Sequence, residues 1–199
     1  MIYLQRHGES VNNLTKIFTC RRLDPGLTEL GRRQIRNLIP YYSAKGINQI
    51  FSSPSKRAVE SAEILSSGLG VEFRTDDCLL EVDVGILEGE SEQDHELLAQ
   101  FHAVMDNWLV EHKNTRFLGG ESFEEVQSRL RTVQSLMSLG QTVVVGHCAL
   151  FAVFLGTRGG AFAKVEDLFL SRGGMATYDQ QARTWRIETV VEPPLRADA

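Results

Sequence analysis

The segment 142–146, Thr-Val-Val-Val-Gly, constrains the fold of this chain more than any other. Three consecutive β-branched apolar residues between polar flanks are typical of a short strand that is buried on both faces. Buried strands of this kind belong to a parallel sheet that is covered by helices. His147 follows the run directly, so the pattern predicts a polar side chain at the carboxyl end of this strand.

The rest of the chain alternates between strand and helix patterns. Strands are predicted at residues 1–6, 47–51 and 71–75, and residues 175–178 and 184–190 are expected to form a closing hairpin. Helices are predicted at about 28–45 (ended or kinked by Pro40), 53–67, 92–111, 122–139 and from about 149. This alternation predicts an α/β fold, a three-layer sandwich with a mostly parallel central sheet and helices on both faces.

Two of the helix starts carry capping signals. Ser53 followed by Pro54 predicts an N-cap with proline at the first helical position. Ser122 with Glu125 three residues later predicts a capping box. These signals give the expected starts of the second and fourth helices.

Length and charge limit the organisation and the partners of the chain. Its 199 residues fit one domain, expected over residues 1–191 with a small cap around 85–120 and a flexible tail at 192–199. The net charge of −5 and the absence of a Lys/Arg run argue against a nucleic-acid partner. No apolar stretch is long enough for a signal peptide or a spanning helix, so we expect no membrane partner and a cytoplasmic location.

The three cysteines, Cys20, Cys78 and Cys148, are far apart in the chain. Their odd number and wide spacing argue against a disulfide framework or a structural zinc site, and they fit a reducing compartment.

Polar residues follow three of the predicted strands. Arg6 and His7 come after the first strand, Ser53 after the second and His147 after the buried valine strand. Ligands of open α/β sheets bind outside the carboxyl ends of the strands. We therefore expect these residues to converge.

Arginines and histidines that converge in this way suit phosphoryl transfer. Arg6 and Arg57 are fixed cations with planar donor groups that match phosphoryl oxygens. His7 and His147 add two imidazoles, and neighbouring arginines disfavour protonation of His7, which keeps it neutral and nucleophilic. The catalysis of such a transfer consists mostly of positioning and charge stabilisation.

The leaving alkoxide needs a proton, so a carboxylic acid is expected on the far side of the pocket. Glu81 is the candidate, because it follows a short apolar stretch and precedes a glycine turn. Asp83 and Glu88 are local competitors for this role.

The ordered motifs of the chain resemble those of the histidine phosphatase superfamily, also called phosphoglycerate mutase-like. The resemblance runs from residue 1 to about 190. Its motifs are Arg6-His7-Gly8-Glu9-Ser10 with Asn13, Leu27-Thr28-Glu29-Leu30-Gly31, Ser52-Ser53-Pro54-Ser55-Lys56-Arg57-Ala58, Glu81-x-x-x-Gly85-x-x-Glu88-Gly89, Gly119-Gly120-Glu121-Ser122 and Gly146-His147.

The resemblance implies a role for each matching residue. It makes His7 the phosphohistidine and Glu81 the acid that later activates water, in a phosphatase that needs no metal and no cofactor. Arg6, Arg57 and His147 would form the phosphate pocket. Further phosphate or substrate contacts are expected at Asn13, Thr19, Cys20 and Cys148.

The chain departs from the family pattern near the second histidine and before Asp24. Cys148 stands where glycine is usual; it either fills space or places a thiol whose oxidation would block activity. Ala152 stands where a basic residue is often found, and Cys20 stands where glycine is common. The last change could reshape the mouth of the substrate pocket.

Hydrolysis of a small phosphate ester is the favoured function, and phosphoglycerate mutase-type transfer is the first alternative. The mutases carry Arg and Tyr at the positions where this chain has Val82 and Val84. These two valines, together with Ile86 and Leu87, suggest a partly apolar substrate mouth. A protein phosphohistidine phosphatase and a non-catalytic phosphate-binding module are further alternatives. The natural substrate stays open, and a homodimer is compatible with the sequence.

Overall fold

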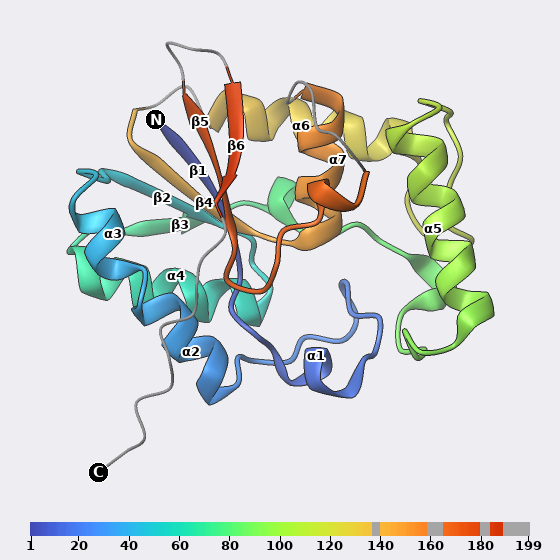
Figure 1. The fold of residues 1–199 in the computed structure, drawn as a ribbon, viewed down its shortest axis with the longest axis horizontal. Coiled ribbons are helices and arrows are strands. Elements are labelled where there is room, and N and C mark those ends of the chain that lie inside the picture. Colours follow the sequence, from blue (N-terminus) through green and yellow to red (C-terminus); the bar gives the residue numbers. More distant parts are fainter. Residues whose placement is uncertain (137–139, 159–164, 180–183, 189–199) are drawn as a thin grey trace.

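Within the residues described by the computed structural model, 1–136, 140–158, 165–179 and 184–188, six strands form one sheet (Figure 1). The strand order is β3-β2-β4-β1-β5-β6. Strands β1 to β4 run parallel, whereas β5 and β6 are antiparallel additions at one edge. The strands are β1 (Ile2–Arg6), β2 (Gln49–Ser52), β3 (Phe73–Thr75), β4 (Thr142–Gly146), β5 (Met175–Asp179) and β6 (Thr184–Glu188).

Strand β4 lies between β2 and β1 and is buried along its whole length, as the valine run predicts. Val143 and Val145 pack with the apolar residues of one face of the sheet, and Val144 packs with those of the other face. Because alternate side chains of a strand point to opposite faces, the run supplies both apolar layers at once.

Helices cover both faces of the sheet. The α-helices are α1 (Val11–Thr15), α2 (Glu29–Arg36), α3 (Ile39–Ser43), α4 (Lys56–Leu69), α5 (His95–Leu109), α6 (Phe123–Leu136) and α7 (Cys148–Arg158), with short 3₁₀ turns at Asp77–Leu79, Gly85–Leu87 and Val165–Leu168. Ile35 of α2 and Leu65 of α4 belong to the apolar layer of Val143, whereas Leu130 of α6 and Phe151 of α7 belong to that of Val144. The three-layer α/β fold with a mostly parallel sheet is therefore confirmed.

The predicted N-cap at Ser53 is wrong by two residues. Helix α4 begins at Lys56, and Ser55 is its N-cap. The Ser53 hydroxyl lies 2.8 Å from Nε2 of His147, and it also accepts a hydrogen bond from the backbone N–H of Ser55. The Ser53 hydroxyl therefore contacts His147 instead of capping α4.

The predicted helix over 28–45 is two helices, α2 and α3. Thr28 caps the first by accepting a hydrogen bond from the backbone N–H of Gly31. Pro40 lies in the first turn of the second helix, where its missing N–H costs nothing. The break lies at Asn37 and Leu38, before Pro40, and Ile39 already belongs to α3.

The capping box at Ser122 is confirmed by two reciprocal hydrogen bonds. The Ser122 backbone N–H donates to Glu125 Oε2 (2.7 Å), and the Glu125 N–H donates to Ser122 Oγ (3.3 Å). The predicted hairpin is present as β5 and β6, but its last two residues, the predicted end of α6 at 139 and the tail at 192–199 lie outside the described residues. In the described part of the chain, no helix is long and apolar enough to cross a membrane.

Candidate active site

Three parallel strands end side by side, and the polar residues after them converge as predicted. Arg6 at the end of β1 is in register with Gly146 at the end of β4. The backbone N–H of His7 donates to the Gly146 carbonyl (3.0 Å), and that of Ser53 donates to the Val145 carbonyl (2.9 Å). The rings of His7 and His147 consequently lie with their centroids 5.3 Å apart.

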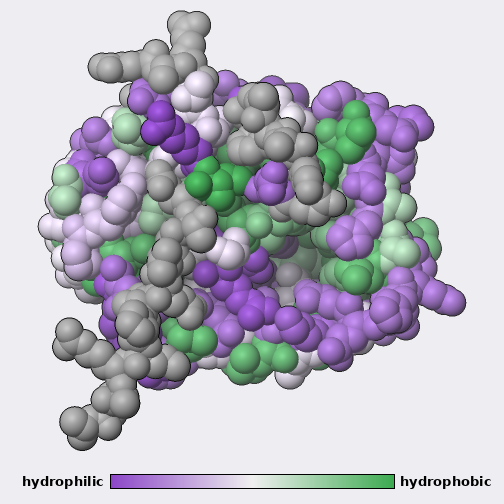
Figure 2. Space-filling view, in the orientation of Figure 1, coloured by the Kyte–Doolittle hydropathy of each residue, from purple (hydrophilic) through white to green (hydrophobic). Residues whose placement is uncertain are grey.

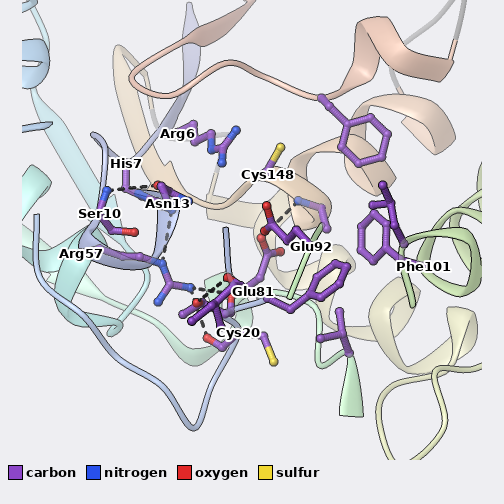
Figure 3. A pocket seen from close by; sticks show the side chains of 17 residues that line it. Arg6, His7, Ser10, Asn13, Cys20, Arg57, Glu81, Glu92, Phe101 and Cys148 are labelled. Carbon is purple, nitrogen blue, oxygen red and sulfur yellow. Dashed lines mark hydrogen bonds between the residues drawn. The ribbon is translucent and has the colours of Figure 1, made fainter. Parts of the chain in front are cut away.

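A cavity of about 250 Å³ opens beside these strand ends. Figure 2 shows a hollow near the centre of this face of the molecule, and Figure 3 shows the side chains that line the cavity. It is lined by Arg6, His7, Ser10, Asn13, Ile17, Phe18, Thr19, Cys20, Arg57, Glu81, Val84, Glu92, Leu98, Phe101, Cys148, Ala149 and Phe169. All of the sequence-predicted site residues except His147 are therefore part of its wall, and His147 lies behind it against His7.

Hydrogen bonding fixes both the orientation and the protonation of His7. Its Nδ1 lies 2.7 Å from the carbonyl oxygen of Gly8, and because a carbonyl only accepts, Nδ1 carries the hydrogen. Burial, together with the charges of Arg57 and Arg6, holds the pKa of His7 well below its usual value. The ring is therefore neutral near pH 7, and the lone pair of Nε2 is available.

Arg57 and Arg6 line the same cavity and supply cationic donors. Nε of Arg57 donates to His7 Nε2 (3.3 Å), while Nη2 of Arg57 donates to the Cys20 carbonyl (3.2 Å). Nη1 of Arg6 donates to the Leu170 carbonyl (2.6 Å). Among the described residues, the buried atoms Arg6 Nε and Arg57 Nη1 have no hydrogen-bond acceptor, and Arg57 Nη1 makes only a long ion pair with Asp24 Oδ1 (3.7 Å). Buried donors without acceptors are costly, and an anion would satisfy them.

His147 adds a buried ring nitrogen without a hydrogen-bond partner among the described residues. Its Nε2 bonds to the Ser53 hydroxyl, and its Nδ1 is buried without a hydrogen-bond partner in the described structure. Burial, then Arg57 and His7, lower the pKa of His147 well below its usual value, so this ring is also neutral. The Ser53 hydroxyl has one hydrogen, which it donates either to Ser55 Oγ (3.3 Å) or to His147 Nε2; in the second case Nδ1 carries the ring hydrogen and can donate to an anion.

Glu81 is held at the N-terminus of α7. Oε1 accepts from the backbone N–H groups of Val82 (2.8 Å) and Leu150 (2.9 Å), and Oε2 accepts from that of Ala149 (3.2 Å). These three backbone donors satisfy the oxygens of a carboxyl group that is only 9% exposed. Arg129 holds the same loop by donating to the Leu80 carbonyl (2.6 Å).

The two competitors of Glu81 do not line the cavity. Asp83 accepts a hydrogen bond from the backbone N–H of Gly85 (2.9 Å). Oε1 of Glu88 accepts from the backbone N–H groups of Cys20, Arg22 and Leu23. Both carboxylates therefore hold loops, which leaves Glu81 as the best-placed of the three acids.

Asp83 and Glu88, with Cys20, also form the group of described residues best arranged for a metal ion. One ligand atom from each lies within 4.8 Å of the others. Glu88 already uses its lone pairs on three backbone donors and on Nε of Arg22, so the group functions as a structural clasp between two loops.

The four remaining predicted contacts all line the cavity, but in different ways. Asn13 Oδ1 accepts from the backbone N–H of Ser10, and Thr19 Oγ1 accepts from Nδ2 of Asn12 (2.9 Å). Burial raises the pKa of the Cys20 and Cys148 thiols. A thiol with a raised pKa is a poor nucleophile, which favours packing over redox chemistry for Cys148.

The apolar part of the cavity differs from the prediction. Only Val84 of the four expected residues lines it; Val82 and Leu87 are buried in the core, and Ile86 is 52% exposed on the surface. The wall is made instead by Ile17, Phe18, Leu98, Phe101 and Phe169, which come from three separate segments. Glu92 lines the same cavity and was not predicted either, because only the tertiary fold brings these segments to the strand ends.

A family profile described as the histidine phosphatase superfamily (branch 1) matches residues 2–193. The chain belongs to this superfamily. The fold agrees with the assignment: a mycobacterial glucosyl-3-phosphoglycerate phosphatase superimposes with a TM-score of 0.72 at 21% identity, covering 94% of this chain and 96% of that one.

Curated members of the histidine phosphatase superfamily carry both phosphatase and mutase names. Phosphoserine phosphatase 1 of Hydrogenobacter thermophilus is 30% identical over 166 residues, 77% of each chain. Putative phosphoserine phosphatase 2 of the same organism is 35% identical over 131 residues, 66% of this chain and 63% of the relative. A probable phosphoglycerate mutase of Erwinia tasmaniensis is 28% identical over 193 residues, 92% of this chain and 86% of the relative. The match spans only 40% of a longer relative, a bifunctional protein of Mycobacterium tuberculosis.

Proposed function

We propose that this superfamily member hydrolyses small phosphate monoesters through a phosphohistidine on His7. The observation that carries the proposal is a set of buried nitrogen atoms without a hydrogen-bond partner, Arg6 Nε, Arg57 Nη1 and His147 Nδ1, on residues that line the cavity of His7 or pack against its ring. Phosphoryl oxygens would satisfy the two arginine donors, and also His147 Nδ1 in the tautomer that carries its hydrogen there, and the phosphorus would then face the nucleophile.

In the first step, Nε2 of His7 attacks phosphorus and the bond from phosphorus to the ester oxygen breaks. The leaving alkoxide takes a proton from Glu81, whose Oε2 accepts only one backbone hydrogen bond and so has room for that proton. The arginines stabilise the charge on the peripheral oxygens. The Gly8 carbonyl stabilises the positive charge that develops on the His7 ring.

In the second step, Glu81, now ionised, accepts a proton from a water molecule that attacks the phosphorus. The bond from Nε2 to phosphorus breaks, inorganic phosphate leaves, and both residues return to their initial states. The three backbone N–H groups around Glu81 stabilise the ionised form between the two steps.

The mutase alternative has support from the relative named as a probable phosphoglycerate mutase. A mutase would return the phosphoryl group to a sugar acid, whose carboxylate needs a cationic partner. The part of the cavity wall beyond the arginines is apolar and carries Glu92, which would repel such a carboxylate. Hydrolysis is therefore the better-supported outcome.

Activity measurements on purified protein would test the proposal. Wild type should release phosphate from p-nitrophenyl phosphate in the presence of EDTA, and His7→Ala should reduce kcat by at least about 1000-fold. Addition of glycerate should leave the rate of phosphate release unchanged, whereas a mutase would form phosphoglycerate. Substantial turnover by His7→Ala would rule out His7 as the nucleophile.

A further inference from the structure

Glu92 is an acidic residue in the cavity that the proposed mechanism does not use. It lies just before α5, where its backbone N–H donates to the Lys16 carbonyl (2.7 Å). This hydrogen bond fixes the segment against the loop that follows α1. The side chain is half-buried and lines the same cavity as His7 and Glu81. Figure 3 shows it between the arginine side of the cavity and Phe101.

The carboxylate of Glu92 has no hydrogen bond or ion pair with any of the described residues. The side chains of Leu98, Phe101 and Phe169 line the same cavity and offer no hydrogen-bond donor. A partly buried carboxylate beside apolar groups is costly unless a positive or hydrogen-bonding partner is present. A bound ligand could supply that partner.

The cavity therefore carries positive charge on one part of its wall and negative charge on another. The arginines Arg6 and Arg57 attract an anion at one end, and Glu92 offers a negative charge further along the wall. A phosphate ester with no other charge would gain nothing from Glu92, and an ester with a carboxylate would be repelled. A cavity volume of about 250 Å³ suits a small phosphate ester.

We propose that Glu92 is a specificity-determining residue, which selects phosphomonoesters whose alcohol part carries an ammonium group. The inference rests on the proposed phosphatase function and adds the chemical class of its substrate. The ammonium group would form a charge-assisted hydrogen bond with the Glu92 carboxylate while the phosphoryl group occupies the arginine end. The apolar residues Leu98 and Phe101 would exclude water from this pair and so strengthen it.

The effect of the ammonium charge can be measured with two esters of nearly equal size. Phosphoethanolamine carries an ammonium group where propyl phosphate carries a methyl group. We expect wild type to have a kcat/KM about five- to tenfold higher for phosphoethanolamine, which is the size of one partly exposed charge-assisted contact. In Glu92→Gln this ratio should fall close to one.

Two further variants complete the test. Glu90→Gln removes the same charge from an exposed residue outside the cavity wall, so it should keep both the activity and the ratio of wild type. Glu92→Lys should invert the preference, so that 2-phosphoglycolate becomes a better substrate than phosphoethanolamine. Circular dichroism would verify that each variant is folded.

The outcomes separate the two proposals. Hydrolysis of both esters with a ratio near one in wild type, or with the same ratio in Glu92→Gln, would overturn the role of Glu92 and leave the phosphatase proposal intact. An equal loss of kcat for both esters in Glu92→Gln would also overturn it, since that pattern is expected of a proton donor. No hydrolysis of any ester would overturn both proposals.

Discussion

Nε of Arg57 lies 3.3 Å from Nε2 of His7, and both side chains are buried. This hydrogen bond directs a cationic donor at the lone pair that the proposed reaction uses. A phosphoryl group that enters the cavity would exchange this bond for one between Arg57 and a phosphoryl oxygen. The arginine would thus both keep His7 neutral and release its lone pair when a substrate binds.

Replacing Arg57 with lysine tests this dual role. Lysine keeps the charge but loses the planar donor fork and Nε, so we expect kcat/KM for p-nitrophenyl phosphate to fall by about 100-fold. The exposed Arg33 provides the control, because Arg33→Lys should retain wild-type activity. Equal activity of Arg57→Lys and wild type would contradict the assignment of Arg57 to the phosphate pocket.

Glu81→Gln should affect substrates according to their leaving groups. A poor leaving group such as an alkoxide needs the proton, so its kcat/KM should fall by about 100-fold or more, whereas p-nitrophenolate leaves with little help. A Brønsted plot over a series of aryl and alkyl phosphates would measure the change in slope. Exposed Glu63, changed to Gln, is the matched control. A uniform loss across the series would point to another acid.

The low pKa values of His7 and His147 predict a dependence of stability on pH. Their pKa values lie well below the unfolded value of about 6.5, so the unfolded chain binds more protons below that pH. Each histidine should therefore lower the free energy of unfolding by up to about 1.4 kcal/mol per pH unit below 6.5, with little effect above it. Urea titrations at pH 7.5 and 5.5 should show a smaller loss for His147→Gln than for wild type. An identical loss would contradict the neutral, buried state of His147.

The parts of the fold that could be predicted from the sequence are those in which a local residue pattern determines the secondary structure. The β-branched run at 142–146 identifies the central strand, and the position of His147 directly after it follows from chain order alone. Convergence of Arg6, His7 and His147 then follows from the parallel arrangement of strands, because their carboxyl ends share one edge. A strand and the residue that directly follows it are local in sequence, so both can be predicted without knowing any tertiary contact.

What could not be predicted depends on partners far along the chain. Ser53 has the sequence signature of an N-cap, but its hydroxyl contacts His147 on another strand end. Val82 and Val84 look equivalent in the sequence, yet only Val84 reaches the cavity. Glu92 is one of several acidic residues in its segment, and its place in the wall is set by the loop after α1.

Glu88 should be important for stability although it is not part of the cavity. Burial would raise its pKa, but the hydrogen bonds from Cys20, Leu23 and Arg22 lower it to about 2. Because the folded-state pKa is depressed, this stabilisation is present above about pH 4.5 and is lost as the pH falls towards 2. Glu88→Gln should lower the free energy of unfolding at pH 7 by about 2–3 kcal/mol, since a glutamine cannot replace the charged acceptor.

Urea titrations of Glu88→Gln and of the exposed control Glu90→Gln would measure this effect. The deficit of Glu88→Gln relative to wild type should shrink at pH 3. A deficit equal to that of the control at pH 7 would show that the clasp between the two loops has no energetic role.

Trapping the phosphoenzyme tests the central claim most directly. Wild type and Glu81→Gln would be mixed with phosphate-labelled substrate, quenched in alkali within milliseconds and analysed by peptide mass spectrometry. We predict an acid-labile, alkali-stable phosphoryl group on His7 that accumulates further in Glu81→Gln, because loss of the base slows hydrolysis, and no label in His7→Ala. Turnover by wild type without label on His7, or label that persists in His7→Ala, would contradict the account.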